Sequence, residues 1–150
     1  MRTLLLALLP LAAPAAQGDD DWPMWRRDPE RTGSSPAALP HPLRLQWIRE
    51  LPPPRPAWPD QTRLPFDAVD EPVAAGGTLF VGSSRTDRLF AFDVRTGALR
   101  WSFLADGPVR FPAAVWEGRV YFVSDDGRLR CLDAERGTLL WSVRGGPSDR

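Results

Sequence analysis

The sequence predicts an all-β protein, a partial β-propeller with two four-stranded antiparallel blades and one N-terminal strand. Three observations predict it. From Pro72 onward, short apolar runs alternate with turn residues. These runs return in the same order in a second unit, and a period of about 40 residues is typical of propeller blades. Upstream, the chain is rich in Pro, which disfavours helices. With 150 residues, 43% of them hydrophobic, and 7 Trp and 7 Phe, the chain is long and apolar enough to form a core.

The N-terminus predicts a secretory signal peptide over residues 1–15. Arg2 precedes a run of Leu and Ala that is too short to span a bilayer, and Ala13 and Ala15 are the small residues expected before a cleavage site. No Cys lies nearby to take a lipid anchor. We therefore expect an exported protein, periplasmic or secreted, with no membrane span.

Residues 16–71 form a Pro-rich segment that we expect to be extended or looped. Within it, Leu43, Leu45 and Trp47 alternate with Arg44 and Gln46, which is the period of a strand and predicts one strand over Leu43–Leu51. His41, the only His, lies between two Pro residues and is expected to be a solvated loop residue rather than a metal ligand.

Two blades are predicted, over residues 72–111 and 112–150. In each, an inner strand of small residues is followed by three apolar runs that are separated by turns. The strands expected in the first blade cover Pro72–Ala75, Thr78–Ser83, Arg88–Asp93 and Ala98–Phe103. Those expected in the second cover Pro112–Val115, Arg119–Ser124, Arg128–Asp133 and Thr138–Val143.

The most regular part of the repeat is a turn followed by a Trp. Asp93, Gly97 and Trp101 recur at one common spacing as Asp133, Gly137 and Trp141. The Asp carboxylate can accept backbone N–H bonds inside a turn, and Gly permits the positive φ that returns the chain. A Trp on the outer strand offers a large apolar surface. We expect Trp101 and Trp141 to pack between blades.

The first copy, Ala91 to Trp101, fits the pattern A-x-D-x-x-T-G-x-x-x-W through Ala91, Asp93, Thr96, Gly97 and Trp101. This pattern resembles the tryptophan-docking repeat of the pyrroloquinoline-quinone-like propellers. The second copy departs from it, since Cys131 replaces the Ala and Arg136 the Thr. The stretch "DWPMWRRDPERTGSSP" also resembles the segment before the first blade in exported members. Tryptophan-aspartate and kelch repeats fit less well, because their Trp-Asp and double-Gly signatures are missing or misplaced.

The resemblance implies a ring of eight blades, whereas the sequence predicts two. Either the chain is a fragment of a longer propeller, which we favour, or its blades associate with other copies through open faces. The family includes quinoprotein alcohol dehydrogenases and non-catalytic relatives. The resemblance to the dehydrogenases implies an adjacent Cys pair, a calcium site and a catalytic Asp. Cys131 is the only Cys, and we expect it in the core.

Two acidic runs do not fit a calcium loop. Asp19–Asp21 and the pair Asp125 and Asp126 lack spaced ligands and the required Gly. The sequence therefore predicts no catalytic, cofactor-binding or metal-binding residue. We expect an exported, non-catalytic binding or scaffold module, with a fragment of a pyrroloquinoline-quinone-dependent dehydrogenase as the alternative. A truncated reading frame without independent activity is a third possibility.

Charge narrows the choice of partner. All 19 basic residues are Arg, scattered along the chain, and 19 acidic residues balance them to a net charge of zero. This balance gives no support for binding nucleic acid or an anionic membrane. The expected partner is an unknown protein or polymer, or another copy of the chain.

Overall fold

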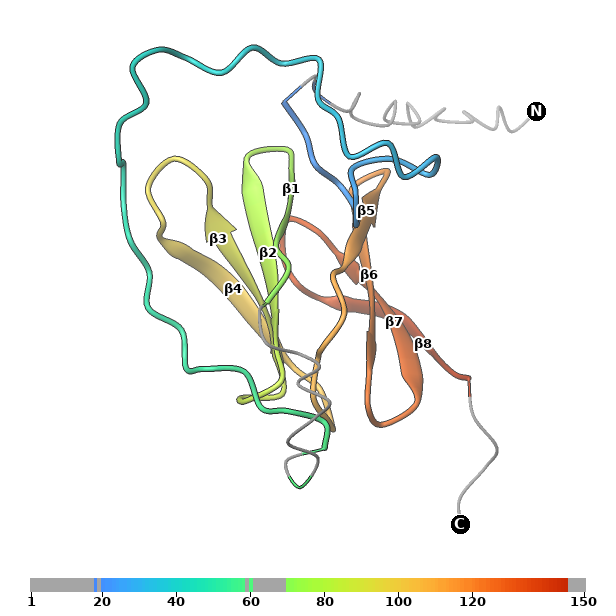
Figure 1. Ribbon diagram of the computed structural model, residues 1–150. Coiled ribbons are helices and arrows are strands. Elements are labelled where there is room, and N and C mark those ends of the chain that lie inside the picture. The colour runs from blue at the N-terminus through green and yellow to red at the C-terminus, as the bar shows by residue number, and fades with distance from the viewer. Residues whose placement is uncertain (1–17, 19, 59, 61–69, 146–150) are drawn as a thin grey trace, which may run out of the picture.

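The computed structural model describes residues 18, 20–58, 60 and 70–145. The signal peptide predicted over residues 1–15 lies outside the described residues. Figure 1 shows two twisted sheets side by side, with the described N-terminal segment running around them. No helix long and apolar enough to cross a membrane occurs in the described part of the chain.

Each sheet is one blade of four antiparallel strands in chain order, as the sequence predicts. The first contains β1 (Val73–Ala75), β2 (Thr78–Ser83), β3 (Arg88–Asp93) and β4 (Leu99–Leu104). The second contains β5 (Ala114–Trp116), β6 (Arg119–Ser124), β7 (Arg128–Asp133) and β8 (Leu139–Arg144).

The outer strands begin one residue later than the pattern predicts, because the preceding residue closes the turn. Asp93 N donates to Ala98 O at 2.8 Å, and Asp133 N donates to Thr138 O at 2.9 Å. Each outer strand also has a register shift, opposite Ala91 in β3 and opposite Cys131 in β7. The same irregularity in both blades places Trp101 and Trp141 at equivalent positions.

The main core lies between the two sheets. One face of the first blade supplies Phe80, Leu89 and Ala91, and the facing side of the second supplies Phe122 and other apolar side chains. Phe103 of β4 meets Phe122 of β6 edge to face, with ring centroids 5.8 Å apart. The blades therefore stack through their apolar faces.

The strand predicted over Leu43–Leu51 does not form. No residue of this range pairs in a sheet, although the segment is extended and follows the side of β3 and β4 (Figure 1). The segment has a strand-like alternation at its start, but among the described residues it makes no backbone pairing with either sheet. A side chain, described below, holds it instead.

The N-terminal segment does reach a sheet, but at another place. Trp22 forms an isolated antiparallel bridge with Ala74 of β1, and Pro23 O accepts a hydrogen bond from Val115 N of β5 at 2.7 Å. Asp21 Oδ1 accepts a further bond from Gly76 N at 3.1 Å. These contacts join the inner strands of both blades and give Asp21 a structural role.

Candidate functional site: the tryptophan sockets

The candidate site is built from two turns that share one geometry. In the first, Asp93 Oδ1 accepts hydrogen bonds from Arg95 N at 3.1 Å, Thr96 N at 2.8 Å and Thr96 Oγ1 at 2.9 Å. Gly97 N donates to Asp93 O at 2.8 Å, and Gly97 has φ +70°. A residue with a Cβ is strained at such a φ. We call the turn Asp93–Gly97 the first socket.

The turn Asp133–Gly137 repeats this geometry and is called the second socket. Asp133 Oδ1 accepts from Glu135 N at 3.0 Å and Arg136 N at 2.8 Å, and Gly137 has φ +69°. Arg136, at the position of Thr96, offers no hydroxyl to this carboxylate. The turn nevertheless forms, because the backbone donors are sufficient.

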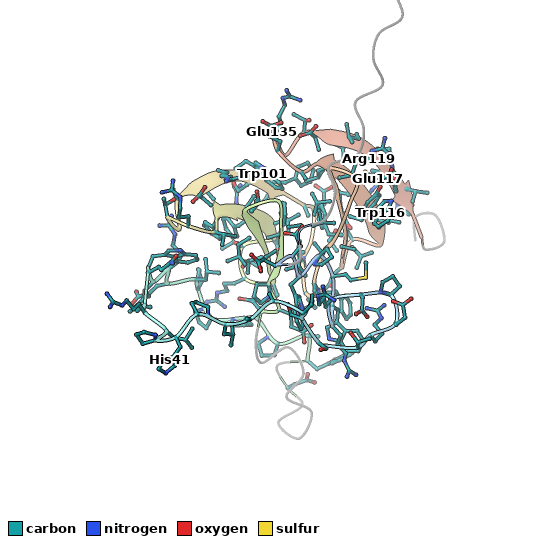
Figure 2. The ribbon with its side chains drawn as sticks, turned by 90° about the horizontal axis from the view of Figure 1, so that it is seen from above. His41, Trp101, Trp116, Glu117, Arg119 and Glu135 are labelled. Carbon is teal, nitrogen blue, oxygen red and sulfur yellow. The ribbon has the colours of Figure 1, made fainter. Side chains whose placement is uncertain are left out.

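Trp101 of the first blade fills the second socket. A Cβ on Gly137 would lie only 2.5 Å from Cδ2 of Trp101, so the ring packs directly on the glycine backbone. Its Nε1 donates to Ala134 O at 3.1 Å. Figure 2 shows Trp101 beside the turn that carries Glu135. Glycine is thus required here for both backbone conformation and close approach.

The first socket is also filled, and by a residue that the sequence analysis did not single out. A Cβ on Gly97 would lie 2.7 Å from Cδ2 of Trp47, and Trp47 Nε1 donates to Val94 O at 2.8 Å. The contact reproduces the one made by Trp101. A signal was present, because the tripeptide Leu-x-Trp occurs at residues 45–47, 99–101 and 139–141.

Trp141 has no socket among the described residues. Its side chain is 42% exposed on β8 and lies 6.0 Å from the ring of Tyr121, in the tilted arrangement that Trp101 adopts with Phe80. Trp141 therefore has the position and neighbours of a docking tryptophan. The packing between blades that the sequence predicts is found for Trp101 only.

The remaining motif residue, Ala91, is fully buried and pairs with Trp101 across β3 and β4. Arg100, the next residue before that Trp, reaches back to the first socket. Its guanidinium donates to Asp93 Oδ2 and to Thr78 Oγ1, each at 2.6 Å. The hydrogen bond from Arg100, followed by those from Thr96, holds the pKa of the Asp93 carboxyl well below its ordinary range.

A second charged cluster ties the loops at the other end of the blades. The buried Arg130 donates to Ser124 Oγ at 2.6 Å and also bonds Asp126 and Asp106. Burial raises the pKa of Asp126, but hydrogen bonds from Arg130 and Ser124 outweigh it and lower this pKa to about 2. Asp125 pairs with Arg110 at 2.6 Å. Both carboxylates of this run thus serve ion pairs.

A cleft of about 480 Å³ opens between the blades, next to the second socket. Its charged lining is mostly acidic, with Arg100 as the one basic residue. Nowhere in the described part of the chain do three or more His, Cys, Asp or Glu side chains gather in a way that could hold a metal ion. The acidic members of the lining are Asp21, Glu117, Asp133 and Glu135.

The described residues do not fit a quinone cofactor. Cys131, the only Cys in the sequence, is fully buried in β7, so no adjacent Cys pair exists. His41 is exposed, and Figure 2 shows it on the N-terminal segment, away from both sheets. The chemistry that the geometry does support is recognition of a glycine turn by an indole ring.

Comparison with known proteins agrees with this geometry. The model of the family described as outer membrane protein assembly factor BamB matches residues 15–149. The chain belongs to this family of pyrroloquinoline-quinone-like propeller repeats. The repeat of this family corresponds to the two four-stranded blades, each of which contains one docking turn.

The relatives include enzymes and an assembly factor. The dehydrogenase subunit of the quinone alcohol dehydrogenase of Gluconobacter oxydans is 36% identical over 89 residues, which are 52% of this chain and 12% of that protein. BamB of Moranella endobia is 28% identical over 71 residues, 47% of this chain and 18% of that protein. The chain thus spans less than a fifth of either.

One solved structure overlays most of the chain. The quinohemoprotein alcohol dehydrogenase of Comamonas testosteroni matches 87% of this chain and 20% of its own, with a TM-score of 0.65 and 26% identity. The likeness extends beyond the two blades, since β1 to β8 span only residues 73–144. It therefore takes in part of the N-terminal segment as well.

Proposed function

We propose that this chain is an exported propeller-repeat module that binds a protein or polymer partner and performs no catalysis of its own. One observation carries the proposal. The motif residues make structural contacts between segments: Asp93, Gly97 and Gly137 form the sockets, and Trp101 fills one of them. The name of the BamB relative, an outer membrane protein assembly factor, supports a role in protein assembly.

A part of a quinone-dependent alcohol dehydrogenase is the second candidate. The 36% identity with the Gluconobacter oxydans subunit and the overlay on the Comamonas testosteroni enzyme favour it. Against it stand the single buried Cys131 and the lack of a metal-holding group among the described residues.

Titration of the purified chain with pyrroloquinoline quinone and Ca²⁺ separates the two candidates. We expect no stoichiometric uptake by equilibrium dialysis and no change in the quinone absorbance. A one-to-one complex would contradict the non-catalytic proposal and support the dehydrogenase alternative. A full-length quinoprotein dehydrogenase treated in the same way serves as the positive control.

Export is tested separately, by expressing residues 1–150 in a Gram-negative host and measuring the mass of the periplasmic product. Cleavage after Ala15 is expected, within a few residues. The matched variant Ala15→Trp replaces the small residue that signal peptidase needs and should accumulate uncleaved. Recovery of unprocessed wild-type chain from the cytoplasm alone would refute export.

A further inference from the structure

We propose that the cleft between the two blades binds an arginine side chain of a polypeptide partner. The inference rests on the proposed binding function and deepens it, because it names the chemistry of the partner. The cleft has a volume of about 480 Å³, and it is lined by the β1–β2 turn, the β5–β6 turn and the second socket. Ligand pockets in proteins commonly measure about 300–1,000 Å³.

An exposed indole ring forms part of the cleft wall. Trp116, the last residue of β5, lines the cleft and is 54% exposed. A guanidinium group stacks favourably on the face of an indole. Two arginines of the chain lie over the ring of Trp25 in this way, but none in the described part of the chain lies over Trp116. The Trp116 ring is therefore available to an arginine of a partner.

Two carboxylates of the lining are also available. Glu117 follows Trp116 in the β5–β6 turn, and Glu135 belongs to the second socket; Figure 2 shows all three at the second blade. Both glutamates are exposed, and neither has a hydrogen bond or an ion pair with another described residue. Asp21 and Asp133, by contrast, already accept backbone hydrogen bonds.

The nearby arginines of the chain leave these two glutamates without a basic partner. Arg100, the one basic residue of the lining, is bound to Asp93 at 2.6 Å. Arg136 pairs with Asp133 at 3.7 Å. Arg119 lies beside the β5–β6 turn but is not among the residues that line the cleft. Charge complementarity therefore favours a basic occupant that stacks on the indole ring and pairs with the glutamates.

Glu117 also has an unfavourable backbone conformation. Its φ is +48°, and Gly118 after it has φ +71°. The equivalent turn of the first blade has glycine at both positions, Gly76 and Gly77, with φ +56° and +72°. A residue with a Cβ is strained in this region, whereas glycine is not. No contact of the carboxylate within the described residues offsets this strain, as is expected where a side chain serves binding.

The test measures binding of a fluorescein-labelled peptide of arginine and glycine to the purified chain, by fluorescence anisotropy at low ionic strength. The same peptide with citrulline in place of arginine has nearly the same shape without the charge. We expect the arginine peptide to bind about fivefold more tightly than the citrulline peptide. The double variant Glu117→Gln/Glu135→Gln should weaken binding of the arginine peptide about fivefold, and Trp116→Ala about threefold.

The matched control is Glu30→Gln/Glu50→Gln. It changes the net charge by the same amount, and both of its glutamates are exposed on the N-terminal segment, outside the cleft. This control should bind the arginine peptide as the wild type does. The proposal is overturned if the control weakens binding as much as the cleft variant, if the cleft variant binds like wild type, or if both peptides bind equally.

The variant Glu117→Gly separates binding from folding. Because glycine stands at the equivalent position of the first blade, this variant should unfold at the same urea concentration as the wild type or a higher one. Its affinity for the arginine peptide should nevertheless fall by about twofold. Unchanged affinity in this variant would overturn the proposal. The quinone titration does not depend on the cleft, so a quinone complex would refute the non-catalytic function alone.

Discussion

Trp101 and Trp141 occupy equivalent positions in the two blades, and this offers an internal control on what a filled socket contributes to stability. Trp101 packs on Gly137 and donates to Ala134 O at 3.1 Å, whereas Trp141 is 42% exposed with no socket among the described residues. We therefore predict that Trp101→Ala lowers the free energy of unfolding far more than Trp141→Ala does.

The magnitudes follow from burial. Replacing a buried Trp by Ala costs about 3–5 kcal/mol, and the lost indole hydrogen bond accounts for about 1 kcal/mol of this. Trp101 is partly buried, so we expect a loss at the lower end, about 3 kcal/mol. Trp141 loses only its contacts within the second blade, and we expect about 1 kcal/mol. The predicted difference between the two variants is therefore about 2 kcal/mol.

Urea unfolding followed by circular dichroism measures this difference. With a slope of about 2 kcal/mol per molar urea, the midpoints of the two variants should differ by roughly 1 M. The slopes must agree for the comparison to hold, because a changed slope signals a changed unfolded or folded state. Equal losses in Trp101→Ala and Trp141→Ala would refute the reasoning, since the socket would then contribute nothing beyond the strand contacts.

Three further predictions follow from the sockets, the ion pairs and the core. Gly137→Ala should destabilise the fold by about 1 kcal/mol more than Gly127→Ala. Both glycines have a positive φ, but an added Cβ would meet no heavy atom within 4 Å at Gly127, whereas it would clash with Trp101 at Gly137. The midpoints of urea unfolding of the two variants measure this difference. The pKa of Asp126, lowered from 3.8 to about 2, means that its ionised form stabilises the fold above pH 4 and that this stabilisation is lost as the pH falls from 4 through 2. Asp126→Asn should therefore be less stable than wild type at pH 6, and thermal unfolding should show the gap narrowing toward pH 2. Cys131, fully buried, should react with a thiol reagent only as the chain unfolds, and fast labelling of the native protein would contradict its position.

The sequence predicts the blades well because each hairpin is specified locally. Alternating apolar residues define the strands, and Asp93 and Gly97 define the turn through bonds between near neighbours in the chain. Such local signals repeat in the second blade, where Cys131 replaces the Ala and Arg136 replaces the Thr of the motif. The pattern did not predict that β4 and β8 begin one residue late. Ala98 and Thr138 have residue types that a strand accepts, but their carbonyl oxygens accept the hydrogen bonds that close the turns.

The N-terminal segment was predicted less well because its contacts are distant in sequence. Alternation from Leu43 to Trp47 indicates a strand-like segment, but periodicity does not reveal whether a strand edge pairs with it. The structure instead brings Trp22 to β1. The pairing of Asp126 with Arg130 was also missed, because a two-residue acidic run looks the same whether it is solvated or engaged in an ion pair.

Trp47 fills the first socket although it does not lie at the spacing of the repeat. The spacing from Trp101 to Trp141, carried one repeat upstream, would place the docking residue at position 61, but Trp47 fills the socket instead. The contact survives this change because it depends on the glycine at positive φ and on the nearby carbonyl oxygen, not on the strands that precede the Trp. The first socket thus accepts an indole from a segment that is not part of either blade.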